Sequence, residues 1–277
     1  MMLKKRVQRL CLPAVFVTAL TSTQAYSANL DDKPIVPDKG MIQLGTLFVF
    51  DSDTTFSASS TKSGLGTTID FSKDLDGDSA ITTPTFEFYY RFTDHHRIEM
   101  GAFQLDREGS QVLNRSFTFQ DRTFSASSQV DSRIENNIYK LAYGYSFYHL
   151  DKVELAVSAG FTVLDYEIEL ISSAGGFTEA ASTTAPMPVF GFRMDYSITP
   201  RLTARFRTDS FYFDFEDKVR GSLLDIQVGL EYRALDHFAF GASLSRLAIA
   251  VDMNGTEFKG RVDDLYRGAR LYGAFFF

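Results

Sequence analysis

Hydrophobic and polar residues alternate one by one through most of this chain. Successive side chains of a β-strand project to opposite faces of a sheet, so a period of two marks a strand. At the C-terminus one face of the segment carries no charge, and it holds Leu271, Gly273, Phe275 and Phe277. No stretch of the chain has the ~20 continuous apolar residues that a membrane-spanning helix requires. The sequence therefore predicts an all-β fold.

The alternating segments have the length of strands that cross a membrane. They cover residues 42–50, 86–92, 139–147, 153–163, 190–198 and 224–232. A strand over residues 153–163 would be about 36 Å long. Tilted by about 45°, it would cross the ~25 Å apolar band of a membrane barrel. We therefore predict a transmembrane antiparallel up-and-down β-barrel.

The N-terminus has the parts of an export signal. Lys4, Lys5, Arg6 and Arg9 precede a short apolar run at residues 10–20, and cleavage could follow Ala25 or Ala28. We predict a signal peptide at residues 1–28, a periplasmic lead-in at 29–40 and the barrel at 41–277. The only cysteine, Cys11, lies in the signal, so the mature chain should contain neither a disulfide nor a thiol nucleophile.

Composition narrows the class further. The chain has 28 Lys and Arg against 35 Asp and Glu, a net charge of −7, and loss of the basic signal would make it more acidic. Such a charge does not suggest nucleic-acid binding. With 27 Phe, 13 Tyr and no Trp, the chain fits the aromatic-rich strands of a membrane barrel.

Short and long connections alternate along the chain and predict the strand number. Short connectors lie at residues 93–96, 149–152, 199–201 and 235–237. Longer ones lie at about 52–81, 109–130, 172–184, 214–221 and 253–261. Inner turns and outer loops in this order join ten strands, with both termini in the periplasm. Eight strands would result if the first hairpin were peripheral, and twelve if residues 117–119 and 124–130 formed an extra pair.

The C-terminal segment, together with the export signal, resembles that of Gram-negative outer-membrane β-barrel proteins. In that family a final Phe with alternate hydrophobic residues is read by the barrel-assembly machinery. The resemblance therefore implies an assembly signal at Leu271, Gly273, Phe275 and Phe277. It also implies location in the outer membrane, contact with its lipid and lipopolysaccharide, and periplasmic chaperones as partners. Residues 67–75 and 138–147 resemble segments of uncharacterised barrel proteins of proteobacteria, which implies no particular activity.

Charged residues of the predicted strands should face the barrel interior, because Arg or Lys facing lipid near the membrane centre costs about 2–4 kcal/mol. The predicted interior residues are Glu87, Arg91, Glu99, Lys140, Glu154, Arg193, Asp195, Arg205, Arg207, Asp209, Asp225, Glu231, Arg233 and Arg270. Basic and acidic members are equal in number, and we expect them to pair, since an unpaired buried charge is costly. A packed lumen follows, whereas a charge-selective pore would have an excess of one sign.

Two features depart from this scheme. Simple alternation points Arg246 and Arg267 at lipid. Either a bulge turns them inward, or they lie close enough to the interface for their side chains to reach water. The hydrophobic face also changes parity after residues 102, 163 and 208 and near 245. We expect either a bulge at these points or a strand leaving the membrane.

Catalytic chemistry is not indicated. Outer-membrane barrel enzymes, such as the ten-stranded omptin proteases and acyl-ester hydrolases, depend on a histidine at the outer side. The four histidines, His95, His96, His149 and His237, lie in or beside predicted inner turns. None would reach an outer Ser or Asp as a general base. The acidic run at residues 74–78 does not fit the EF-hand pattern. We therefore predict no catalytic residue, metal or cofactor.

These observations favour a non-enzymatic envelope protein with a charge-paired, packed lumen. Its outer loops would contact lipopolysaccharide or a surface partner that the sequence does not specify. One alternative is a narrow porin-like channel for small solutes. A second alternative is an omptin-like or lipid-modifying barrel enzyme.

Overall fold

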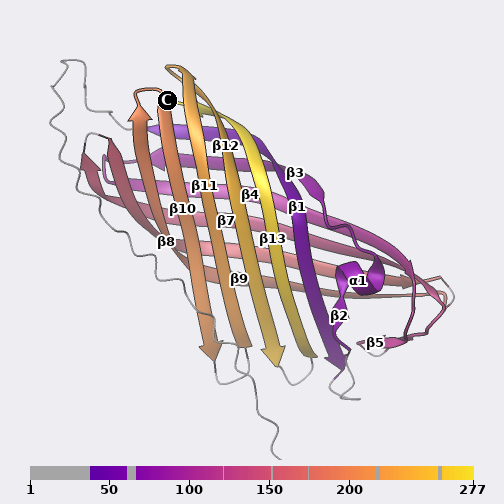
Figure 1. The fold of residues 1–277 in the computed structure, drawn as a ribbon. Helices are drawn as coiled ribbons and strands as arrows, with labels where there is room; N and C mark the ends of the chain where they lie inside the picture. The colour runs from indigo at the N-terminus through magenta and orange to yellow at the C-terminus, as the bar shows by residue number, and fades with distance from the viewer. Residues whose placement is uncertain are drawn as a thin grey trace, which may run out of the picture. The chain divides into compact units, whose positions relative to one another are not determined.

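A computed structural model describes residues 38–60, 67–120, 122–150, 152–173, 175–215, 219–254 and 258–277. The predicted signal peptide at 1–28 and most of the lead-in at 29–40 lie outside these residues. Ten strands form one antiparallel series: β1 (Gly40–Ser60), β3 (Ile81–Arg91), β4 (His96–Val112), β7 (Gln129–Leu150), β8 (Val153–Ser172), β9 (Phe177–Thr199), β10 (Leu202–Phe215), β11 (Val219–Leu235), β12 (Phe238–Asn254) and β13 (Phe258–Phe276). β13 pairs back onto β1, which closes the barrel (Figure 1). The predicted ten-stranded barrel is confirmed.

The connections differ at the two ends of the barrel. At one end, here called the turn end, short turns join β3 to β4, β7 to β8, β9 to β10 and β11 to β12, as predicted. The start of β1 and the end of β13 meet there. The Gly40 N–H donates to the Phe277 carbonyl at 2.8 Å, and the Phe277 N–H donates to the Gly40 carbonyl at 3.0 Å. The opposite end, the loop end, carries the longer connections.

Small elements fill two of the loop-end connections. β2 (Ile69–Asp70) pairs with β1 and leads into the helix α1 (Phe71–Leu75). Asp70 caps this helix by accepting the Lys73 backbone N–H at 3.0 Å. β5 (Phe117–Phe119) and β6 (Arg122–Phe124) form a separate two-stranded sheet, so the twelve-stranded alternative is wrong. Among the described residues, no helix is long and apolar enough to cross a membrane.

The strands run further toward the loop end than the sequence pattern predicts. The pattern assigns residues 52–81 and 172–184 to loops, but β1 continues to Ser60 and β9 begins at Phe177. The prediction depends on an apolar outward face, which these segments lack. Backbone pairing does not need that face, and β8 stays in register with β9 as far as Ser172 and Phe177. The predicted loop boundaries are therefore wrong.

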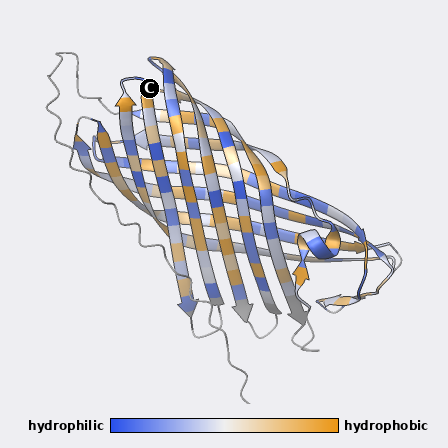
Figure 2. Ribbon diagram, in the orientation of Figure 1, coloured by the Kyte–Doolittle hydropathy of each residue, from blue (hydrophilic) through white to orange (hydrophobic). Residues whose placement is uncertain are grey.

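Outward-facing apolar side chains form a surface that we call the apolar belt. Its exposed members include Leu44, Phe50, Phe86, Leu141, Val157, Phe161, Phe190, Leu230, Leu244 and Leu271. Figure 2 shows hydrophobic and hydrophilic residues alternating along these strands. Toward the loop end the outward residues become polar, as at Asp53 on β1 and Glu167 on β8. The belt therefore ends near Phe50 and Phe161, and the barrel continues beyond it.

The changes of hydrophobic parity mark where strands leave the belt. On β8 no register shift occurs from Val153 to Ser172, so no bulge turns the strand over. Instead Leu164 points inward while Asp165 points outward. The pairings of β4, β10 and β12 also keep their register at the other three predicted changes. Register shifts lie elsewhere, at Phe50 on β1, Phe147 on β7, Ile198 on β9 and Ala234 on β11.

The interior changes from charged to apolar along the barrel. Toward the loop end its buried side chains include Leu47, Leu105, Leu164, Met187, Leu223 and Ile249. A further cluster combines strand residues with α1, β2 and the β5–β6 hairpin, and it includes Phe56, Ile69, Phe71, Leu75, Phe119, Phe124 and Ile134. We call these two clusters the apolar plug, because they fill the loop-end interior with hydrophobic side chains.

Candidate functional site in the charged interior

All charged residues predicted for the interior, from Glu87 on β3 to Arg270 on β13, are buried or half-buried. They share the inward face of their strands with small residues. On β9, a Cβ atom added to Gly191 would lie 2.5 Å from the Asp209 Oδ1 atom, so a glycine leaves room for that carboxylate. The outward positions between the charges belong to the apolar belt. The strand pattern thus collects acids and bases from many strands in one enclosed space.

A continuous series of ion pairs, here called the ion-pair chain, crosses this space. In order, its members are Arg91, Glu154, Arg97, Glu99, Arg193, Asp195, Arg205 and Glu231. Successive nitrogen–oxygen distances are 2.6, 3.3, 2.5, 4.0, 2.8, 3.8 and 2.7 Å. The side chains come from β3, β4, β8, β9, β10 and β11. Acids and bases alternate, so the buried charges compensate one another.

An aromatic ring lies among the arginines of this chain. Tyr89 is buried, and the guanidinium carbons of Arg91, Arg97 and Arg193 lie 5.6, 5.8 and 5.8 Å from its ring centroid. Cations are attracted to the face of an aromatic ring, most strongly where water is excluded. Tyr89 therefore fills the space between cations without adding a competing charge.

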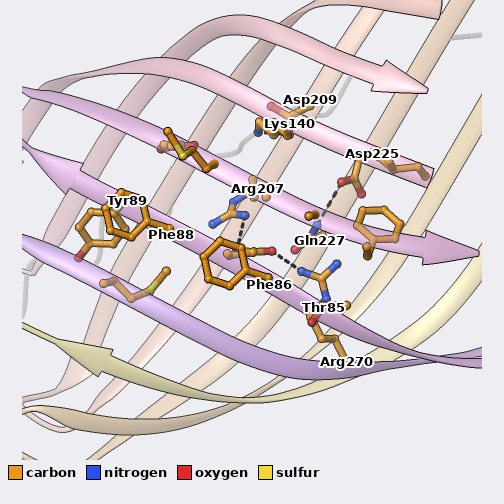
Figure 3. Close-up of a pocket in the computed structure, with 18 of the residues that line it drawn as sticks. Thr85, Phe86, Phe88, Tyr89, Lys140, Arg207, Asp209, Asp225, Gln227 and Arg270 are labelled. Atoms are coloured by element: carbon orange, nitrogen blue, oxygen red, sulfur yellow. Dashed lines mark hydrogen bonds and ion pairs between the residues drawn. The ribbon is translucent and has the colours of Figure 1, made fainter. Parts of the chain in front are cut away.

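A second group of charges lies around Glu87. Figure 3 labels its members Lys140, Arg207, Asp209, Asp225 and Arg270. Its Oε2 atom accepts a hydrogen bond from Arg207 at 2.8 Å, and its Oε1 atom accepts one from Arg270. Lys140 donates to Asp209. One carboxylate thus bridges two arginines from β10 and β13, far apart in the sequence.

Asp225 is the least compensated acid of this group. It lies opposite Asp209 in the β10–β11 register, and its carboxylate accepts a hydrogen bond from Gln227 at 3.1 Å. A cavity of about 50 Å³ adjoins these residues, enough for a few water molecules. A second cavity, of about 110 Å³, lies at the turn end and is lined by Asp38 and Arg201, among others.

Several charged members of the interior were not predicted from the sequence. Arg97 is 1% exposed and joins Glu154 to Glu99; its parity with Glu99 could have revealed it. Asp38 of the lead-in pairs with Arg233, a contact between distant segments that no local pattern signals. Arg107 and Asp264 share the inward parity but lie beyond the belt.

The predicted assembly-signal residues lie on the outward side of the last strand. Leu271, Phe275 and Phe277 are 55%, 38% and 45% exposed, and Gly273 shares their parity. All four histidines lie at the turn end. His95 and His237 each place Nδ1 within hydrogen-bond distance of a backbone carbonyl, that of Ser146 at 2.8 Å and that of Phe276 at 2.9 Å.

Arg246 and Arg267 face outward, and no bulge turns them inward. They lie opposite each other in the β12–β13 register, and Arg267 forms an ion pair with Asp51. Asp51 directly follows Phe50, the last apolar belt residue of β1. Both arginines therefore lie at the loop-end edge of the belt, the second of the two predicted alternatives.

No family model and no curated protein matches the sequence, but several solved structures share its architecture. The outer-membrane protease OmpT of Escherichia coli aligns over 86% of this chain and 97% of its own, with a TM-score of 0.54 and 8% identity. The fold is that of an outer-membrane β-barrel. OprG of Pseudomonas aeruginosa aligns over 85% of this chain and 95% of its own, with a TM-score of 0.42 and 13% identity. At such low identity the likeness concerns the fold and not the activity.

Proposed function

We propose that this protein is a non-enzymatic, integral outer-membrane barrel with a closed lumen, whose function is carried by its loop end at the cell surface. The apolar belt would contact lipid, and the turn end would face the periplasm. Beyond the belt, polar outward residues such as Asp53 and Glu167 would project into the space outside. Strands that extend past the membrane would thus hold a surface available to lipopolysaccharide or another envelope partner.

The ion-pair chain is the observation that best supports a closed lumen. Opposite charges joined from wall to wall occupy the interior behind the belt, and the apolar plug fills the loop end. Separating a buried ion pair leaves charges without partners, which costs several kcal/mol. Thermal opening of a water path through both layers would therefore be rare.

Single-channel recording of the refolded protein in planar bilayers tests this proposal. We expect no steady conductance from the wild type. The double variant Arg97→Ala with Glu99→Ala removes one acid and one base from the ion-pair chain, and it should produce intermittent current. The matched control is Arg133→Ala with Glu135→Ala, which removes an outward pair at 2.9 Å and should stay silent. Steady wild-type conductance at the nanosiemens scale would contradict a closed lumen.

That contrary result would favour the alternative, a narrow channel for small solutes. The specific observation in its favour is the pair of cavities with charged linings, of about 50 and 110 Å³. Water in these cavities could join if the ion pairs rearranged. The balance of acids and bases argues against strong ion selectivity in such a channel, because selective pores concentrate one sign.

The placement of the histidines supports a non-enzymatic role. His95, His96 and His237 belong to turn-end connections or their edges, far along the strands from the loop end. An omptin-like or lipid-modifying reaction at the outer side would lack a histidine base from them. We expect the purified barrel to release no product from fluorogenic peptides or from phospholipid. Turnover abolished by substituting one loop-end carboxylate would contradict this.

The proposed orientation is tested by labelling intact cells. A cysteine at Gly175, in the β8–β9 connection at the loop end, should react with a membrane-impermeant maleimide. A cysteine at Asp94, in the β3–β4 turn, should react only after the outer membrane is breached. The reverse pattern would place the histidines outside and reopen the question of enzymatic activity.

The C-terminal segment supports the proposal that the barrel-assembly machinery is a partner of this protein. Phe277 contributes both backbone hydrogen bonds to Gly40 and an outward ring. Phe277→Ala keeps the backbone bonds and removes only the ring that the assembly machinery would read. We expect lower outer-membrane levels of this variant in cells but unchanged refolding of the purified chain in detergent. Equal defects in both assays would assign Phe277 a purely structural role.

A further inference from the structure

Polar side chains are buried within the apolar interior of the loop end. They are Thr54, Arg107, Asn136, Tyr166, Asp264 and Tyr266, none more than 7% exposed. Arg107 is well satisfied, since it donates to the Thr54 hydroxyl and to the Asp78 carbonyl, both at 2.6 Å. In contrast, both carboxyl oxygens of Asp264 and the hydroxyl of Tyr166 have no hydrogen-bond partner in the part of the chain that the structure describes.

An unpartnered buried carboxyl is costly, because it has lost water without gaining another donor. Asp264 lies between Thr54 of β1 and Ile249 of β12 in the two registers of β13, beyond the apolar belt. Burial raises the pKa of the Asp264 carboxyl to about 7, and Asp263 adds to this rise, while the nearby hydroxyls of Thr54 and Tyr166 and the charge of Arg107 oppose it. Although these hydroxyls lie nearby, neither carboxyl oxygen of Asp264 has a well-formed hydrogen bond among the described residues, so both can accept from a further donor.

A cavity of about 60 Å³ adjoins this carboxyl. Apolar side chains form most of its wall: Phe56, Phe119, Ile168, Ile249, Val251 and Val262. Asp264 and Tyr166 contribute buried polar atoms to the same wall. Ser182 and Arg261 also line it and are exposed, so the cavity reaches the surface near them.

The wall on the β9 side consists of residues that pair with β8 but not with β10. Pairing between β9 and β10 ends at Phe190 and Ser210, whereas the cavity contacts β9 at residues 181–183 and 185. Pro186 and Pro188 lie between these positions, and proline has no N–H to donate to a neighbouring strand. The sequence therefore keeps this edge of the cavity free of the β10 ladder.

We propose that this cavity binds a small, mostly apolar molecule with one hydrogen-bond-donating group, a primary amine or an alcohol. The donor would reach Asp264 and Tyr166, and the apolar body would lie against Ile168 and Ile249. One water molecule needs about 10–15 Å³ of such space, so the volume suits about four or five non-hydrogen atoms. The proposal concerns the loop end alone, and it holds whether or not the lumen conducts.

Methyl NMR of the isoleucine-labelled barrel in lipid nanodiscs tests this binding. n-Butylamine and n-butanol are the probes, and 1-chlorobutane is the analogue without a donor. We expect saturable shifts of the Ile249 and Ile168 methyl groups with at least one of the two donor probes. The Ile42 methyl group, on the lipid face, should shift no more than it does with 1-chlorobutane. No saturable shift with either donor probe, or equal affinity for 1-chlorobutane, would overturn the proposal.

Matched variants separate the carboxyl from the cavity. Asp264→Asn should weaken n-butylamine binding by about tenfold or more, because a charge-assisted hydrogen bond is lost. Asp263→Asn, on the outward face of the same strand, should leave it unchanged. Ala181→Leu fills the cavity and should abolish binding of every probe, whereas Ala180→Leu points outward and should not. Equal binding by wild type, Asp264→Asn and Ala181→Leu would place the probes elsewhere and refute the site.

Discussion

The two halves of the barrel interior are built from the same strands but have opposite side-chain patterns. Behind the apolar belt the inward side chains are charged, as in Arg97 and Glu99 of β4. Further along the same strand, the inward position is Leu105, which is fully buried. The outward positions change in the opposite sense, from Met100 within the belt to Glu108 beyond it. One strand therefore carries two inverted patterns without a register shift.

The difference shows that the outer solvent decides which face of a strand is apolar. Where lipid surrounds the barrel, burial of apolar side chains inside would leave polar ones in lipid, so polar residues fill the interior and must pair. Where water surrounds it, the interior becomes an ordinary hydrophobic core, stabilised by area removed from water. The loop-end half is thus built like a water-soluble β-barrel on top of a membrane barrel.

The variant with the largest expected effect on this comparison removes one buried charge from the membrane half. Arg97→Ala leaves Glu99 and Glu154 without their shared partner, and Arg97 is 1% exposed. We expect a loss of about 3–5 kcal/mol in the free energy of unfolding, measured by urea titration in lipid vesicles. Arg133→Ala is the control, because Arg133 pairs with Glu135 on the outer surface beyond the belt. It should cost at most about 1 kcal/mol. Equal costs would mean that the interior pairs are solvated.

A second test places the same new charge on the two outward surfaces of one strand. Val157→Arg adds a cation within the belt on β8, and Glu167→Arg adds one beyond it at the same parity. The first should cost about 2–4 kcal/mol if Val157 lies near the membrane centre, and the second much less. Refolding into vesicles and unfolding in urea measure both. Similar costs would show that the belt does not end between Val157 and Glu167.

The barrel itself could be predicted because its signal is local. Alternation within strands such as residues 153–163, and short turns such as 199–201, are visible in the sequence one segment at a time. The predicted inward charges also lie on the inward side, since parity follows directly from the alternation. The loop boundaries could not be predicted in the same way. Beyond the belt, β9 presents polar and small residues on its outward side, so nothing in the pattern distinguishes strand from loop there.

Pairings between distant residues could not be predicted either. Glu87 meets Arg270 across the β1 strand that lies between β3 and β13, and the Asp38–Arg233 pair joins the lead-in to β11. The sequence does not single out Asp264 as a candidate site residue, because a carboxyl on the inward parity resembles a paired interior charge until its surroundings are known. Its apolar neighbours come from strands that are far apart in the sequence, so no local pattern indicates the cavity.

The smallest expected effect concerns one cross-strand pair within the ion-pair chain. Asp195 and Arg205 lie opposite each other in the β9–β10 register, and their closest charged atoms are 3.8 Å apart. Each also has a nearer partner, Arg193 at 2.8 Å for Asp195 and Glu231 at 2.7 Å for Arg205. We therefore expect Asp195→Ala and Arg205→Ala to be coupled, so that the double variant loses less stability than the two single variants summed.

Because the nearer partners remain, this coupling should be modest, about 0.2–1 kcal/mol, and smaller than that of Asp195 with Arg193. Double-mutant cycles on both pairs, from urea unfolding in vesicles, measure the two values side by side. If the two substitutions at Asp195 and Arg205 simply add, the pair is separated by water and the ion-pair chain is broken at its step between β9 and β10. Current through the double variant Asp195→Ala with Arg205→Ala, absent from the wild type, would instead show that this step helps to close the lumen.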